Sequence, residues 1–207
     1  DWQAVKVNDD ASSFWVKHKQ EKYLVKWDLI GDHNMANALA AIAAAHHVGI
    51  SIANSVESLS NFKSVKRRME LIYDNEKVRI FDDFAHHPTA ITETLNGLRQ
   101  SVGNEPIIAI LEPRSNTMKQ GIHKHLLAGS LNAATASLIF ADENVKWDIA
   151  ELQSDSISTF SNTDQLLNNA ANFIHKQTQR CNVLIMSNGA FEQVGQRLQN
   201  RLTTKQS

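Results

Sequence analysis

Polar and apolar residues follow two different patterns along the chain, one before about residue 60 and one after it. In the first 30 residues, short runs of β-forming residues alternate with polar turns, which predicts a meander of three strands. The alanine-rich stretch at residues 31–45 predicts a long helix, because alanine has the highest helix propensity. Residues 54–59 predict a second, shorter helix.

The second pattern is a regular alternation of apolar runs and helical periodicity. Four of these runs are short and rich in β-forming residues: 77–81, 106–111, 137–141 and 182–186. An uninterrupted apolar run is typical of a strand that is buried on both faces of a parallel sheet. The alternation therefore predicts an α/β fold, with a mostly parallel, Rossmann-like sheet and helices on both faces.

A further strand is expected at residues 65–73, where two adjacent arginines lead into apolar residues. Side chains of neighbouring strand residues point to opposite faces, so at most one of Arg67 and Arg68 is expected to reach a shared site. The linker at residues 61–64 separates the two patterns, and we place a domain boundary there.

This boundary divides the chain into domains of residues 1–62 and 63–207. Three short strands alone bury little apolar surface, so the first domain is expected to complete a sheet whose other strands lie upstream. The sequence starts with Asp1 instead of a methionine, which we interpret as the start of a fragment of a longer protein.

Three polar turns follow predicted strands, at residues 82–87, 112–119 and 187–191. In open α/β sheets, ligands bind in the crevice at the carboxyl ends of the strands, so we expect the three turns along one sheet edge. The first turn carries two aspartates and two histidines, followed by Pro88, which favours the first position of a helix. An ordinary connection with solvated charges is the alternative interpretation. Without a third ligand, the adjacent histidines do not define a metal site.

Composition argues against nucleic-acid-binding, disulfide-rich and membrane-spanning classes of protein. The formal net charge is −1, so nucleic acid is not an expected partner. Cys181 is the one cysteine, which excludes a disulfide framework and fits a reducing compartment. The sequence has neither an apolar stretch of membrane-spanning length nor a signal peptide at its start. We therefore expect a cytoplasmic protein that does not bind membranes. A monomer is expected as well, although none of these features determines the oligomeric state.

Three motifs follow one another along the chain: Gly31-x-His33-Asn34-x-x-Asn37, Arg68-Met69-Glu70 and Asp82-Asp83-Phe84-Ala85-His86-His87-Pro88. Their order and spacing resemble those of the Mur ligases, the ATP-dependent enzymes that form amide bonds in bacterial cell-wall synthesis. The chain resembles the second half of these enzymes. Residues 112–119 and 187–191 resemble the members that join UDP-N-acetylmuramate to the recycled tripeptide L-alanyl-γ-D-glutamyl-meso-diaminopimelate. Members that add free L-alanine carry a different sequence at residues 112–119.

The resemblance implies an enzyme of three domains, of which this chain holds the end of the central ATP-binding domain and the whole C-terminal domain. It implies ATP and Mg²⁺ as cofactors and an acyl phosphate that the amine of the peptide attacks. The chain has no Gly-x-x-Gly-Lys-Thr/Ser phosphate loop and no lysine matching the carbamylated lysine of the family. By itself it is therefore expected to be inactive.

The resemblance also implies site residues. It assigns nucleotide binding to His33, Asn34, Asn37, Arg68 and Asp83. It assigns catalytic roles to His86 and Arg68. It assigns binding of the acceptor peptide to His86, His87, Arg114, Ser115, Asn116, Lys119 and Asn188. No residue is assigned as a metal ligand.

The chemistry of these residues suits the roles. An asparagine amide offers a donor and an acceptor, as the edge of adenine requires. Taken in isolation, the two asparagines are better explained as a cap and a polar first turn of a core helix. Arg114 and Lys119 provide directional positive donors for a peptide with several carboxylates. A histidine near the amine would keep it unprotonated for attack. The alternatives are a ligase for free L-alanine and a non-catalytic module that binds nucleotide or peptide.

Overall fold

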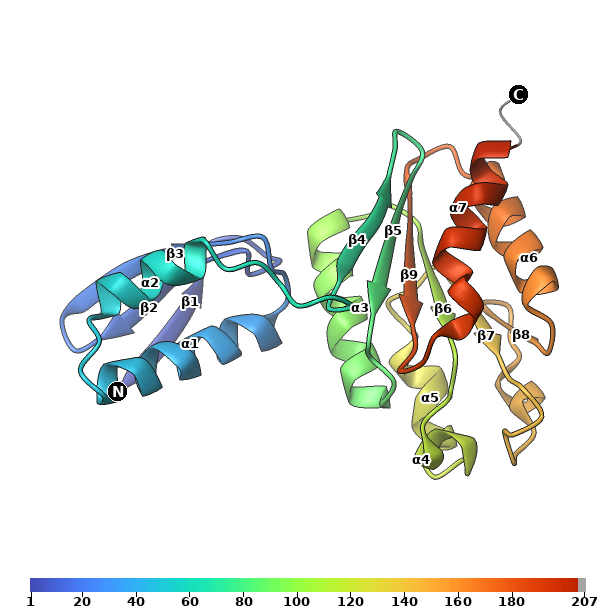
Figure 1. The fold of residues 1–207 in the computed structure, drawn as a ribbon, viewed down its shortest axis with the longest axis horizontal. Coiled ribbons are helices and arrows are strands. Elements are labelled where there is room, and N and C mark those ends of the chain that lie inside the picture. The colour runs from blue at the N-terminus through green and yellow to red at the C-terminus, as the bar shows by residue number, and fades with distance from the viewer. Residues whose placement is uncertain (205–207) are drawn as a thin grey trace. The chain divides into compact units, whose positions relative to one another are not determined.

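The computed structural model describes residues 1–204 (Figure 1). The chain divides into two compact units, residues 1–65 together with 96–103, and residues 66–95 together with 104 onward. The first unit contains an antiparallel sheet with the strand order β1 (Trp2–Lys6), β2 (Ser13–His18) and β3 (Glu21–Lys26). The predicted meander is therefore confirmed.

Two helices complete the first unit, α1 (Asp32–His47) and α2 (Ile52–Ser60). Alternate residues of the central strand, Phe14 and Val16, are fully buried, because one face of the sheet packs against these helices. The remaining buried core residues are Val25, Ala38, Ile42 and Ile52.

The second unit contains a six-stranded sheet with the order β4-β5-β9-β6-β7-β8. The strands are β4 (Glu70–Asp74), β5 (Val78–Asp83), β6 (Ile107–Leu111), β7 (Ala136–Phe140), β8 (Ile157–Phe160) and β9 (Cys181–Met186). β4 runs antiparallel to β5, whereas the neighbouring pairs from β5 to β8 are parallel. The predicted α/β fold with a mostly parallel sheet is confirmed.

Helices follow most of the parallel strands. They are α3 (Pro88–Val102), α4 (Asn116–Lys119), α5 (Lys124–Ser130), α6 (Thr163–Lys176) and α7 (Val194–Thr204), with the short segments η1 (Ile149–Leu152) and η2 (Phe191–Gln193). As predicted, α3 begins at Pro88, where the missing N–H of proline costs no hydrogen bond.

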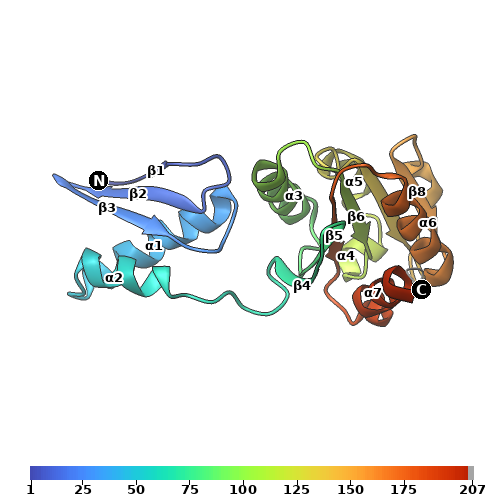
Figure 2. The same ribbon diagram turned by 90° about the horizontal axis from the view of Figure 1, so that it is seen from above.

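Both faces of the large sheet are buried. Ile108, Ile110, Val183 and Ile185 pack in one core with α6 and α7. The residues between them in the same strands point to the opposite face and are equally buried, so that face is covered as well. Helices α3 and α5 lie there, on the side of the sheet away from α7 (Figure 2).

The last strand of the chain, β9, lies in the middle of the sheet. It pairs in parallel with β5 on one side and with β6 on the other. The turns that follow these three strands therefore meet at the carboxyl edge of the sheet, as the sequence predicts for residues 82–87, 112–119 and 187–191. Because β9 is inserted between β5 and β6, the three turns of the candidate site lie next to one another.

The structure corrects the strand expected at residues 65–73. Its first half is a turn, in which Arg67 and Met69 have positive φ angles of 60° and 50°, and strand β4 begins only at Glu70. The rule that neighbouring side chains point to opposite faces therefore does not apply to Arg67 and Arg68. Strand β8 and helix α4 were not predicted.

No helix among residues 1–204 is long and apolar enough to cross a membrane.

Cys181, at the start of β9, is fully buried, and burial raises the pKa of its thiol to about 12. The thiol is therefore protonated at pH 8, and the thiolate is the species that reacts with disulfide reagents. We predict that an aromatic disulfide reagent labels the native chain on the order of a hundredfold more slowly than the urea-unfolded chain. Because the chain has one cysteine, the absorbance change reports this strand alone. Rapid labelling of the folded chain would contradict the buried position of β9.

Candidate functional site

Ser187 connects the three turns at the carboxyl edge of the sheet. It is fully buried directly after β9. Its N–H donates to the Asp83 carbonyl (3.2 Å), and its own carbonyl accepts from Arg67 Nη2. Its hydroxyl donates to Glu112 Oε2 (2.5 Å) and accepts from the Gly189 N–H (2.9 Å). The turns after β5, β6 and β9 thus form one hydrogen-bonded unit.

Asp83 holds the first turn in shape. Its Oδ2 accepts from the Met69 N–H (2.8 Å) and its Oδ1 accepts from the Ala85 N–H (2.7 Å). The residue is only 4% exposed. Both carboxylate oxygens therefore tie the start of β4 to the turn that carries the histidines.

Two arginines gather around the ring of Phe84. The guanidinium carbons of Arg67 and Arg68 lie 5.4 Å and 5.7 Å from its centroid, within the range of cation–π contacts. Arg67 also pairs with Asp82 (Nε–Oδ2, 3.2 Å). Burial raises the pKa of Asp82, and this arginine offsets part of that rise. The expectation that at most one arginine reaches a shared site relied on a strand at these residues, which the structure does not contain; the positive φ at Arg67 turns the backbone, and both arginines approach the same ring.

The two histidines of the first turn have different neighbours. Nδ1 of His86 lies 2.9 Å from the Phe84 carbonyl oxygen. His87 packs edge-on against His123, with ring centroids 4.5 Å apart, and its Nδ1 accepts from the Thr89 N–H (3.3 Å). Because a carbonyl oxygen can only accept, Nδ1 of His86 carries the proton and neutral His86 has an unprotonated Nε2.

The second turn presents its polar side chains from α4. The Ser115 hydroxyl caps this helix by accepting from the Met118 N–H, and Asn116 is exposed. Lys119 Nζ lies 3.8 Å from Asp142 Oδ2. A hydrogen bond from the Asn144 side chain, helped by nearby Lys119, holds the pKa of Asp142 below its ordinary value.

The third turn ends in a left-handed segment. Phe191, Glu192 and Gln193 have φ angles of 39°, 46° and 56°, a conformation that costs roughly 1–2 kcal/mol per residue. The Phe191 ring is buried against Phe140, with centroids 5.6 Å apart. Tertiary contacts therefore hold a conformation that this sequence does not favour locally.

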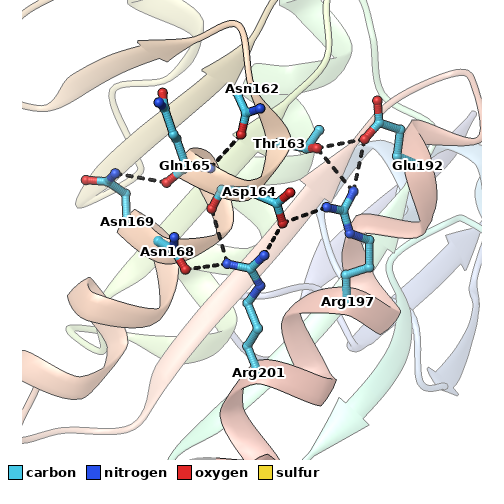
Figure 3. A network of polar contacts seen from close by, with 9 residues as sticks. All are labelled: Asn162, Thr163, Asp164, Gln165, Asn168, Asn169, Glu192, Arg197 and Arg201. Carbon is cyan, nitrogen blue, oxygen red and sulfur yellow. Dashed lines mark hydrogen bonds and ion pairs between the residues drawn. The ribbon is translucent and has the colours of Figure 1, made fainter.

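Figure 3 shows the polar contacts that fix the same segment. Glu192 Oε2 accepts from the Thr163 hydroxyl (2.7 Å) and from Arg197 Nη1 (2.9 Å). Arg197 and Arg201 both pair with Asp164, so α6 and α7 are linked across the turn. These contacts anchor the end of the segment that carries Asn188.

Two cavities lie at this sheet edge. One, of about 250 Å³, is lined by Arg67 and Asp82 and by residues 189–191 and 193–196. The second, of about 520 Å³, is lined at the ends of β7 and β8 by residues 140–144 with Ser161. Asn188 Oδ1 is buried and accepts no hydrogen bond in the described part of the chain.

The nucleotide residues predicted before residue 62 lie at the start of α1. The Asn34 side chain donates to the Ile30 carbonyl (2.7 Å), which leaves its own oxygen as an acceptor. Asn37 is exposed, and His33 is half-buried with its Nδ1 unpaired among residues 1–204. Within the same range, no three His, Cys, Asp or Glu side chains form a group that could hold a metal ion.

The predicted residues of the second unit thus fall into three neighbouring groups. Asp83, His86 and His87 belong to the first turn, Arg68 precedes β4 and lies near the Phe84 ring of that turn, and Asn188 belongs to the third. Arg114, Ser115, Asn116 and Lys119 belong to the second. Residues 67–189, which contain the first two turns and the start of the third, match the family model described as Mur ligase, glutamate ligase domain.

The chain belongs to the Mur ligase family. A Haemophilus influenzae relative, UDP-N-acetylmuramate–L-alanyl-γ-D-glutamyl-meso-2,6-diaminoheptanedioate ligase, is 40% identical over 99% of this chain. A solved murein peptide ligase from Psychrobacter arcticus is also 40% identical, covers 98% of this chain and superposes with a TM-score of 0.70. A UDP-N-acetylmuramate–L-alanine ligase from Brachyspira hyodysenteriae is 47% identical over 41% of this chain and corresponds to 18% of its own length.

This Mur ligase chain spans about half the length of the first two relatives, 46% and 44% respectively.

Sequence reasoning missed Glu112, Ser187 and Gly189, which hold the turns of this Mur ligase chain together. A signal was present for the first two, because each directly follows a strand that is buried on both faces. A polar residue directly after such a strand lies at the edge of the sheet but is still buried, so it needs a hydrogen-bonding partner. The role of Gly189 depends on a contact between turns and has no local signal.

We predict that Asp83→Asn lowers the free energy of unfolding by about 1–3 kcal/mol, because the new NH₂ group cannot accept one of the two backbone N–H bonds. The matched control is Asp82→Asn, where a partly exposed ion pair is lost and the cost is below about 1 kcal/mol. Urea unfolding of both variants compares the two costs. Equal costs would contradict the structural role of Asp83.

Proposed function

We propose that the protein containing this chain is an ATP-dependent ligase that joins UDP-N-acetylmuramate to L-alanyl-γ-D-glutamyl-meso-diaminopimelate. The observation that carries this proposal is the extent of similarity. A relative named for this tripeptide matches 99% of the chain, whereas relatives named for L-alanine match between 41% and 64% of it. The similarity to the tripeptide ligase includes the three turns that carry the proposed peptide contacts.

The charges and space at the sheet edge support a peptide acceptor. Arg114 is exposed, and its side chain with that of Lys119 offers donors to carboxylates. The cavity of about 520 Å³ beside Asp142 provides room for an acceptor longer than one amino acid. The buried, unpaired oxygen of Asn188 suits an N–H donor of the peptide. Ser115, Asn116 and His87 complete the proposed peptide contacts.

The proposed nucleotide contacts come from His33, Asn34 and Asn37 in the first unit and from Arg68 and Asp83 in the second. The free oxygen of Asn34 and the exposed amide of Asn37 fit the edge of a base. Asp83 already accepts two backbone N–H bonds, so ribose hydroxyls would share oxygens that the turn uses. We therefore propose Asn34, Asn37 and Arg68 as the main contacts, with Asp83 supporting the turn.

The described residues do not fit a magnesium site, because no group of carboxylates or histidines among residues 1–204 could hold the ion. The chain also has no phosphate loop. We propose that residues outside this chain supply the phosphate loop and hold Mg²⁺, that Arg68 reaches the phosphates from this chain, and that the chain alone does not transfer a phosphoryl group. The assignment of residues 1–62 to the central domain stays a prediction, as do the cytoplasmic location and the monomeric state.

ATP would supply the energy that activates the sugar carboxylate for attack. The contribution of this chain is to hold the peptide and to receive the proton of its amine. His86 is the proposed acceptor, because its Nδ1 donates to the Phe84 carbonyl and Nε2 is left unprotonated. Most of the acceleration in such a reaction comes from positioning the two reactants.

The substrate assignment is tested by measuring ADP release by the full-length protein with UDP-N-acetylmuramate and either the tripeptide or free L-alanine. We predict turnover with the tripeptide and none with L-alanine at the same concentration, because only the tripeptide has carboxylates that reach Arg114 and Lys119. Turnover with L-alanine alone would establish the other specificity. No ADP release with either acceptor would favour a non-catalytic binding module.

We predict that His86→Ala lowers kcat for the tripeptide by about a hundredfold, the range of general-base catalysis, and changes KM by less than about threefold. His86→Asn is the matched control, because its amide can still donate to the Phe84 carbonyl but cannot accept the proton. Steady-state kinetics should show that both variants lose kcat equally. Full activity in His86→Asn would assign the residue a structural role only.

A further inference from the structure

Arg114 lies directly across the backbone of Gly189. A Cβ built at Gly189 would be 2.4 Å from Arg114 Cδ and 2.5 Å from both Nε and Nη1 of the same side chain. These are the three heavy atoms nearest to that position. The second and third turns of the site are therefore in contact through an arginine and a glycine.

The glycine is not needed for its backbone conformation. Positive φ angles occur at Gly31, Gly49, Gly103 and Gly121, but Gly189 has an ordinary φ that alanine also adopts. A methyl group at Gly189 would instead clash with the outer part of the Arg114 side chain. The absence of a side chain at Gly189 therefore allows Arg114 to occupy this place.

Glu112 and Ser187 fix both sides of the contact. Glu112 Oε1 lies 3.6 Å from Arg114 Nη1, while its Oε2 accepts from the Ser187 hydroxyl. That hydroxyl in turn accepts from the Gly189 N–H. The buried Glu112 carboxylate thus orients the Arg114 guanidinium. Through the Ser187 hydroxyl, it also fixes the Gly189 backbone against which that guanidinium packs.

Arg114 remains accessible in this position. Its side chain is 48% exposed, whereas that of Glu112 is 11% exposed. A guanidinium has five N–H donors, and the pair with Glu112 leaves several of them directed at solvent. The arrangement holds an arginine in one place while its donors stay open to a carboxylate.

We propose that Gly189 is a positioning residue, acting with Glu112 and Ser187, that holds Arg114 for the carboxylate of an acceptor peptide. This inference rests on the proposed function, because the carboxylate is that of the proposed substrate. Fixing a long side chain before binding removes an entropy cost from association. Removing this cost strengthens substrate binding and leaves the chemical step unchanged, so the effect is expected in KM and not in kcat.

The test is a double-mutant cycle of Gly189→Ala and Arg114→Ala in the full-length protein, with ADP release measured against tripeptide concentration. Gly189→Ala is expected to raise KM about three- to tenfold and to change kcat less than about twofold. In the Arg114→Ala background, the same substitution is expected to change nothing further. An unchanged KM, or an equal rise in both backgrounds, would overturn the proposal.

The matched control is Gly129→Ala. A Cβ at this helical glycine meets no atom within 4 Å, and its φ is ordinary. The control should leave KM and the melting temperature unchanged. Gly189→Ala should lower the melting temperature no more than Arg114→Ala does, because both variants remove the guanidinium from its place beside Glu112. A larger loss of stability in Gly189→Ala than in Arg114→Ala would instead indicate a structural role for the glycine and overturn the proposal.

The position of Arg114 is also tested without substrate. Phenylglyoxal modifies accessible guanidinium groups, and peptide mass spectrometry gives the rate at Arg114. We expect Gly189→Ala to raise this rate, whereas Gly129→Ala should not. If the wild-type protein releases no ADP with the tripeptide, the proposed function fails while this measurement still decides whether Gly189 positions the arginine. Equal rates in all three proteins would overturn that role.

Discussion

The hydrogen bond between the buried Ser187 hydroxyl and the Glu112 carboxylate holds the carboxyl edge of the sheet together. A buried carboxylate is costly unless it is paired and hydrogen-bonded. Here Ser187 satisfies one oxygen and Arg114 lies beside the other. The same serine also binds the turn after β5 through its backbone. Because one residue satisfies partners on three turns, the turns keep a fixed arrangement on a rigid sheet.

This arrangement has consequences for catalysis in a Mur ligase. Groups that bind and orient a substrate must be held closely, and sites on rigid elements hold them better than isolated loops do. His86, Arg114 and Asn188 come from turns at the ends of adjacent parallel strands. The proposed acceptor site therefore belongs entirely to the second unit, whereas the proposed phosphate loop and magnesium contacts lie outside this chain.

The left-handed segment at Phe191–Gln193 also supports the carboxyl edge of the sheet. Three consecutive residues other than glycine adopt a conformation that L-residues disfavour. A buried aromatic ring and the pairs of Glu192 with Thr163 and Arg197 hold the segment in place. Strain of this kind persists where the surroundings over-determine the conformation, and here it lies directly beside the residues proposed to bind peptide.

The sequence by itself determined the local elements, the α/β class and the position of three polar turns after buried strands. These follow from periodicity and turn chemistry, which are properties of neighbouring residues. It also carried the Mur ligase motifs that place Arg68, Asp83 and His86. Only the tertiary structure decided that β9 lies between β5 and β6, that both Arg67 and Arg68 approach Phe84, and that Gly189 lies under Arg114. Each of these depends on contacts between residues far apart in the chain, and such contacts leave no periodic signal in the sequence.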